Sequence, residues 1–281
     1  MQGPFQTLKI NDIKVKKMNI PKIDPSKIKG YDMISELYAN IYMVAHKKSG
    51  KTTCIFNILK ECANKDTKLV FFGSTIYNDP TYKAIFKYFK KNGNPILRYT
   101  SIMDTNDKID RLQELLDSLK VRIEDYDSDS DNEAKKPPPP PKYISVDEDK
   151  EIEKEIKKRK PKKIAPEIIF VFDDLSKSMR IPSFVTLLKT NRHFKSKTII
   201  SSQNVKDILP DARENVDILM LFKGIKRDLL ETIYEDFNIK LSLDDFIQLY
   251  NDSTQENHSF LYINTREHEF RKTFCERYLL E

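Results

Sequence analysis

The nine residues from Ala45 to Thr53, AHKKSGKTT, have the types and spacing to hold a phosphate group. They follow the apolar run IYMV and precede the apolar run CIFNIL, which predicts a strand, a tight loop and a helix in that order. In such a loop, consecutive backbone N–H groups at a helix N-terminus surround phosphate oxygens. Lys51 would reach the β- and γ-phosphates of ATP, and the Thr52 hydroxyl would bind Mg²⁺. The candidate nucleotide-binding residues are Ala45, His46, Lys47, Lys48, Ser49, Gly50, Lys51, Thr52 and Thr53.

Ala45 departs from the phosphate-loop pattern G-x-x-x-x-G-K-[ST], because it stands where the first glycine is expected. Alanine is compatible with the loop if its backbone φ is negative, since only a positive φ strongly favours glycine. The alternative is a chance GKT before a helix.

Two carboxylates end a second apolar run, IIFVFDD, which spans Ile168 to Asp174. Acidic side chains are rarely buried without a partner, and ligands bind at the carboxyl ends of parallel strands. We expect Asp173 to hold Mg²⁺ and Asp174 to polarise the attacking water. The alternative for Asp174 is a cap on the following turn.

Gln203 ends the next predicted strand, KTIISSQ, where its amide could sense a γ-phosphate or orient water. An amide in this place can also be an ordinary cap. Arg192 and Arg213 are the candidates for charge compensation, because a guanidinium group matches phosphate oxygens. In a ring, such an arginine would serve the nucleotide of a neighbouring subunit. Both can equally be surface arginines.

The composition of the 281 residues is 39% hydrophobic and 33% charged, which suits one globular domain with polar additions. The net charge of +6 is compatible with a polyanionic partner without requiring one. Three cysteines are too few and too scattered for a disulfide framework, and Cys54 and Cys62 are expected in the core. With no apolar run long enough for a membrane span and no signal-peptide pattern, we expect a soluble intracellular protein.

The chain divides into an N-terminal arm or edge hairpin (1–38), a P-loop ATPase domain (39–265) and a C-terminal tail (266–281). A Pro-rich and charged insertion over 124–163 interrupts the domain and is expected to be disordered. Alternating strands and helices elsewhere predict an α/β fold with a central, mainly parallel sheet flanked by helices. Expected strands cover 40–45, 68–73, 167–174, 197–203, 216–223 and 258–265, and expected helices cover 51–63, 81–91, 107–122, 181–189, 226–237 and 242–250.

The motifs AHKKSGKTT, FVFDD, NRHFKSKTIISSQ and LPDARENVDILMLF, in this order, resemble the genome-packaging ATPases of large DNA viruses and virophages. These form the poxvirus-type branch of the FtsK/HerA superfamily, and the resemblance covers about 41–222 without the insertion. It implies a RecA-like core in a homo-oligomeric ring that uses ATP and Mg²⁺ to move double-stranded DNA into a capsid. Capsid or portal-vertex proteins would be further partners, in the host-cell cytoplasm (the viral factory) or the virion. The implied catalytic residues are Lys51, Asp174, Gln203 and Arg192, and the implied Mg²⁺ ligands are Thr52 and Asp173.

Three other functions compete with a packaging motor. A DNA pump or helicase of the same superfamily would usually carry an added domain. A nucleotide-dependent capsid-assembly scaffold would use the Pro-rich insertion and hydrolyse little ATP. A small-molecule kinase would need a lid and an acceptor motif, and neither is visible. The lysine clusters at 87–93 and 223–228 can contact DNA phosphates or simply be solvated helix ends.

Overall fold

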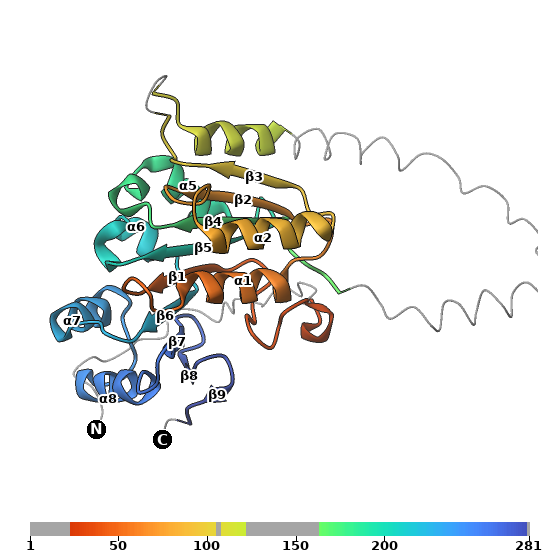
Figure 1. Ribbon diagram of the computed structural model, residues 1–281. Coiled ribbons are helices and arrows are strands. Elements are labelled where there is room, and N and C mark those ends of the chain that lie inside the picture. The colour runs from red at the N-terminus through yellow and green to blue at the C-terminus, as the bar shows by residue number, and fades with distance from the viewer. Residues whose placement is uncertain (1–22, 105–107, 122–162, 280–281) are drawn as a thin grey trace, which may run out of the picture.

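Nine strands form one sheet in the order β3-β2-β4-β5-β1-β6-β7-β8-β9 (Figure 1). The structure is a computed structural model that describes residues 23–104, 108–121 and 163–279. The strands from β3 to β6 in this order are all parallel, and β7, β8 and β9 continue the sheet antiparallel. The strands are β1 Asn40–Val44, β2 Lys68–Gly73, β3 Ile96–Tyr99, β4 Ile168–Asp173, β5 Ser196–Ser202, β6 Ile218–Phe222, β7 Phe260–Asn264, β8 Glu269–Lys272 and β9 Glu276–Arg277.

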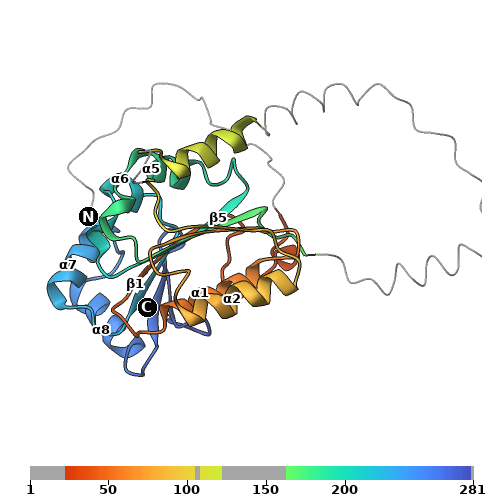
Figure 2. The same cartoon turned by 45° about the horizontal axis from the view of Figure 1, so that its top comes forward.

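Helices cover both faces of the sheet, as Figure 2 shows from another side. α1 and α2 pack on one face, and α5 to α8, with a helix over 111–121, pack on the other. The helices are α1 Lys51–Cys62, α2 Pro80–Lys91, α5 Pro182–Thr190, α6 Pro210–Arg213, α7 Arg227–Asp236 and α8 Leu243–Ser253, and the short 3₁₀ turns are η1 Pro25–Lys27, η2 Ser176–Met179 and η3 Val205–Asp207.

The central strands are apolar on both sides because each side contacts helices. In β1, Ile41 and Met43 belong to the core beneath α1 and α2, whereas Tyr42 and Val44 belong to the core on the opposite face. All five residues of the strand are buried. Burial on both faces explains why the apolar runs of the sequence are continuous rather than alternating.

The predicted fold class is confirmed, and the expected strands and helices match observed ones to within a few residues. Cys54 and Cys62 are buried, as expected. The expected insertion lies almost wholly outside the described residues, as does most of the expected N-terminal arm. Three strands, β3, β8 and β9, were not predicted, and the last two lie in the segment assigned to a tail. Where the structure describes the chain, no helix is long and apolar enough to cross a membrane.

Candidate nucleotide-binding site

The sheet order brings three predicted residues together. β5 lies between β1 and β4, so Gln203, which follows β5, sits between the loop that follows β1 and the acidic end of β4. The Lys51 ammonium lies 3.3 Å from Oδ1 of Asp174. The Gln203 amide Nε2 donates to the same oxygen at 3.2 Å. An amine, a carboxylate and an amide therefore converge at the carboxyl edge of the sheet, where α/β proteins bind ligands.

The loop before α1 has the backbone bends that a phosphate cradle needs. Lys48 has a φ of 63° and Gly50 a φ of 94°, and Gly50 is the N-cap of α1. Ala45 is buried with a negative φ, and its N–H donates to the carbonyl of Ser202 at 3.0 Å. Alanine is thus tolerated where the pattern expects glycine. The Ser49 hydroxyl donates to the carbonyl of His46 at 2.8 Å, which closes the turn.

Lys51, Thr52 and Thr53 form the first turn of α1, directly after this loop. The side chain of Lys51 is buried, Thr52 is half-buried and Thr53 is exposed. His46, Lys47 and Lys48 are exposed around the loop. The first N–H groups of a helix carry a partial positive charge and favour anions. The geometry of the loop is therefore suited to the phosphates of a nucleotide.

Asp173 is held by a residue that the sequence did not point to. The hydroxyl of Tyr82, in α2, donates to Oδ2 of Asp173 at 2.7 Å. Burial raises the pKa of Asp173, and the Tyr82 hydrogen bond opposes that rise. Burial and the adjacent carboxylate raise the pKa of Tyr82 well above its usual value, so its hydroxyl stays protonated and remains a donor. Tyr82 and Asp173 are 91 positions apart, and no local pattern connects them.

The donors near Asp173 fit Mg²⁺ bound together with a nucleotide. Within the described residues, Oδ1 of Asp173 and the hydroxyl of Ser201 are buried and neither makes a well-formed hydrogen bond. The two residues are register partners in β4 and β5, and the nearby Ser201 hydroxyl still helps to lower the pKa of Asp173. In the described part of the chain, no cluster of three or more His, Cys, Asp or Glu side chains could hold a metal by itself. Mg²⁺ commonly binds one or two carboxylates together with substrate phosphates. Thr52 and Asp173 would hold the ion, which would neutralise phosphate charge.

Asp174 is strained and accessible. Its φ is 53°, a conformation that non-glycine residues seldom adopt and that is often found at functional sites. Its N–H donates to the carbonyl of Ser201 at 3.1 Å, and its side chain is one-third exposed. This conformation points the carboxylate of Asp174 toward Lys51 and Gln203, while Asp173 remains in the sheet.

Within one chain, Arg192 does not lie beside Lys51, Asp174 and Gln203. It precedes β5 and so lies at the amino end of that strand, whereas Gln203 follows the carboxyl end. A strand of seven residues spans roughly 20 Å. Arg192 is exposed and forms an ion pair with Glu36 at 3.4 Å.

Arg213 is engaged in the protein interior. Its side chain is 10% exposed, and Nη1 lies 2.6 Å from Oδ2 of Asp236. This pair joins α6 to the end of α7. Arg213 therefore holds two helices together.

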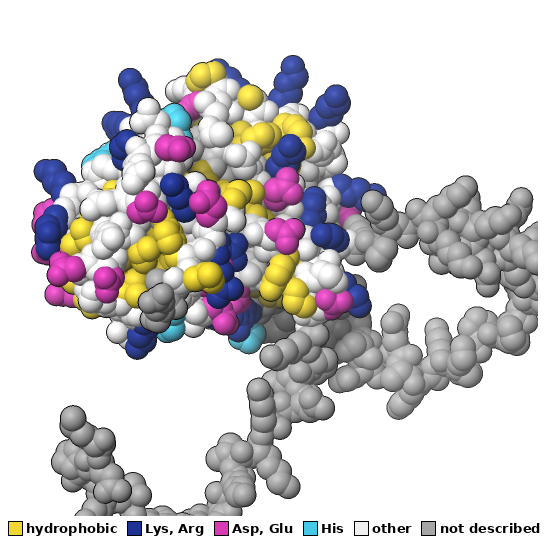
Figure 3. Space-filling view, turned by 90° about the horizontal axis from the view of Figure 1, so that it is seen from below, with side chains coloured by type: hydrophobic (Ala, Val, Ile, Leu, Met, Phe, Trp, Pro, Cys, Tyr) yellow, Lys and Arg dark blue, Asp and Glu magenta, His cyan; other side chains and the backbone are white. Residues whose placement is uncertain are grey.

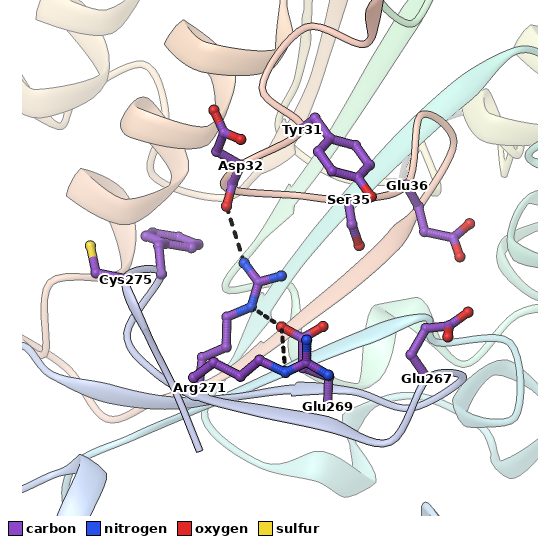
Figure 4. A pocket seen from close by; sticks show the side chains of 10 residues that line it. Tyr31, Asp32, Ser35, Glu36, Glu267, Glu269, Arg271 and Cys275 are labelled. Carbon is purple, nitrogen blue, oxygen red and sulfur yellow. Dashed lines mark hydrogen bonds and ion pairs between the residues drawn. The ribbon is translucent and has the colours of Figure 1, made fainter. Parts of the chain in front are cut away.

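Two hollows lie near these groups. One, of about 300 Å³, adjoins the candidate site and is lined by His46, Gln203, Asn204, Lys206, Lys226, Asp228, Leu229 and Thr232. A larger one, of about 690 Å³, lies beside β8 and the segment before β1 (Figure 4). Arg271 lies there between Asp32 and Glu269, and Glu36, the partner of Arg192, is part of its wall. The larger hollow thus belongs to the Arg192 side of the sheet and not to the phosphate loop.

Comparison with known proteins identifies the fold. No protein-family model matches the chain. No curated protein matches it either. Among solved structures, the genome packaging NTPase B204 from Sulfolobus turreted icosahedral virus 2, in complex with AMP, aligns with a TM-score of 0.52 and 13% identity, over 87% of this chain and 100% of that one. B204, the DNA-packaging ATPase from Sulfolobus turreted icosahedral virus, aligns with a TM-score of 0.50 and 14% identity, over 83% and 95%. The chain has the fold of these viral NTPases, as the resemblance implies.

Proposed function

We propose that this chain is an ATP-hydrolysing motor that moves double-stranded DNA into a viral capsid. The observation that carries the proposal is the convergence of Lys51, Gln203 and Asp174 beside the loop before α1. Lys51 would neutralise charge on the β- and γ-phosphates, Asp174 would polarise the attacking water, and Gln203 would orient it. Asp173 and Thr52 would hold Mg²⁺.

Lys51 and Asp174 face each other at 3.3 Å. A γ-phosphate would attract Lys51 away from Asp174, which would leave that carboxylate free to accept a proton from water. Gln203 bonds the same oxygen and would then be the remaining partner that holds it in place. The chemistry of hydrolysis would thus begin only once the triphosphate is bound.

The DNA partner is supported by the fold and by the family motifs more than by surface charge. The similar structures are described as genome-packaging or DNA-packaging proteins. On the face shown in Figure 3, acidic and basic side chains are interspersed and form no continuous basic stripe. A translocating motor reads the DNA backbone and needs no base contacts. Capsid or portal-vertex proteins would be the other partners, a homo-oligomeric ring the working form, and the host-cell cytoplasm the place of action.

The test measures ATP hydrolysis by the full chain with Mg²⁺, with and without linear duplex DNA. We expect stimulation by DNA of at least severalfold, and loss of hydrolysis by about 100-fold or more in Lys51→Ala and Asp174→Asn. Lys60→Ala, an exposed lysine later in α1, is the matched control and should keep wild-type activity. Unchanged rates in both site variants would refute the site. Hydrolysis without DNA stimulation in an assembled ring would favour the capsid-assembly scaffold.

A further inference from the structure

The segment that joins α8 to β7 returns to the phosphate loop. β7 runs antiparallel to β6, and the pairing of Phe222 with Phe260 places the start of β7 at the edge where the parallel strands end. The residues just before β7 therefore lie at the candidate site, although they follow Lys51 by some 200 positions in the sequence. Lys223 fixes this segment by donating to the carbonyl of Gln255 at 2.6 Å.

The imidazole of His258, in this segment, lies against Gly50. A Cβ at Gly50 would lie 3.1 Å from Nδ1 of His258 and 3.4 Å from its Cβ. Gly50 also has a φ of 94°. The backbone at position 50 therefore favours glycine, and any side chain there would also crowd the histidine ring.

At the other end of the loop, a second histidine ring lies against a glycine. Nε2 of His46 is hydrogen-bonded to the carbonyl oxygen of Gly224 at 2.8 Å. A Cβ at Gly224 would lie 3.2 Å from Cδ2 of His46, and Gly224 has a φ of 96°. The phosphate loop is thus attached near both ends to the β6–β7 pair, once through its own histidine and once through His258.

We propose that His258 is a nucleotide-positioning residue. Its ring supports the backbone at Gly50, where α1 begins and where the N–H groups must face the phosphates. A loop already held in its binding conformation loses less conformational entropy when ATP binds, which lowers the dissociation constant. The inference rests on the proposed function, since it assigns a residue to the same site. It also gives the C-terminal strands a part in nucleotide binding.

The experiment compares KM and kcat for ATP in three variants of the full chain. His258 has a φ of 66°, so His258→Gly removes the ring without straining the backbone. We expect KM to rise at least about threefold while kcat stays within about twofold, because the ring acts on binding and touches no reacting atom. His258→Asn, which tolerates this φ and places a polar group near Nδ1, should recover part of the affinity.

His268→Gly is the matched control, because His268 is also exposed with a positive φ of 51° but lies in the turn between β7 and β8. It should leave KM unchanged. Equal KM values in His258→Gly and the wild type would overturn the inference, and so would an equal rise in His268→Gly. If the wild-type protein neither binds nor hydrolyses ATP, the proposed function itself fails, which is a distinct result.

Discussion

At the scale of single residues, the buried carboxylate of Asp173 marks a conflict between stability and function. Burial raises its pKa above the ordinary value of 3.8. Folding therefore favours the protonated carboxyl, a contribution that is present below about pH 4 and is lost as the pH rises through the raised pKa. At neutral pH the folded protein holds a poorly solvated charge, which the Tyr82 hydrogen bond and the Lys51 charge offset only in part and which a bound cation would balance further.

Asp173→Asn should therefore melt at a higher temperature than the wild type at pH 7 without nucleotide, although it would not hydrolyse ATP. In a domain of this size, 1 kcal/mol corresponds to about 2 to 4 °C. The difference should shrink toward pH 4, where the wild-type carboxyl becomes protonated. Thermal melts across this pH range provide the measurement, with the more exposed Asp174→Asn as the control. A lower melting temperature for Asp173→Asn at pH 7 would contradict the argument.

Tyr82 is a second residue whose effect on metal binding can be separated from its effect on stability. Its hydroxyl fixes Oδ2 of Asp173 and so leaves Oδ1 for a metal. Loss of such an outer partner typically weakens metal binding by 10- to 100-fold. In Tyr82→Phe we expect the Mg²⁺ concentration for half-maximal ATP hydrolysis to rise about tenfold, with kcat at saturating Mg²⁺ nearly unchanged.

Tyr42→Phe is the matched control for Tyr82→Phe. The Tyr42 hydroxyl is also buried, but it bonds Ser202 at 2.8 Å and the carbonyl of Asn204 at 2.9 Å. Its loss should lower stability and leave the Mg²⁺ dependence as it is. The same Mg²⁺ dependence in Tyr82→Phe and the wild type would show that Tyr82 has no part in metal binding.

At the scale of elements, the strands that could be predicted are those buried on both faces. β1, β4 and β6 are nearly continuous apolar runs, as expected of strands that are buried on both faces. β8 could not be predicted, because Glu269–Lys272 is a polar strand at the periphery, and β3 is short and only partly buried. Their strand character comes from pairing with neighbours, which a local pattern does not contain.

The candidate site was predictable where its residues follow a strand directly, as Asp174 and Gln203 do, or belong to a recognisable loop motif, as Lys51 does. Their approach to one another depends on strand order, since β5 is inserted between β1 and β4. Sequence spacing does not encode that order. Tyr82 and His258 were missed for the same reason, because each reaches the site from a separate element through tertiary packing.

The ion pair of Arg213 and Asp236 joins α6 to α7, so its removal tests how strongly these two helices are held together. Removing one member of a fully buried pair typically costs about 3 to 5 kcal/mol, but the Asp236 side chain is 29% exposed and so remains partly solvated. We expect Arg213→Ala to lower the free energy of unfolding by about 1 to 2 kcal/mol, measured by urea denaturation. The double variant with Asp236→Ala should cost less than the sum of the single variants. If Arg213→Ala instead keeps wild-type stability and loses ATP hydrolysis only in an assembled ring, Arg213 is the trans-acting arginine.

At the scale of the whole molecule, two functional candidates occupy opposite edges of one sheet. Lys51 lies at the carboxyl edge, and Arg192 lies at the amino end of β5. The rigid strands between them prevent a chain from bringing its own Arg192 to its own phosphates. A neighbouring copy in a head-to-tail ring could do so, because such an interface joins two different surfaces of the same protein.

A mixing experiment tests this arrangement. Arg192→Ala keeps its phosphate loop, and Lys51→Ala keeps its arginine, so each homo-oligomer alone should be nearly inactive. If Arg192 acts in trans, mixed rings should regain part of the wild-type ATP hydrolysis, because some interfaces combine an intact loop with an intact arginine. Lys195→Ala, an exposed lysine of the same turn, is the control and should be active alone. If Arg192→Ala is fully active by itself, Arg192 has no part in hydrolysis and serves only in its ion pair with Glu36. If rings shown to contain both variants are inactive, Arg192 does not act in trans.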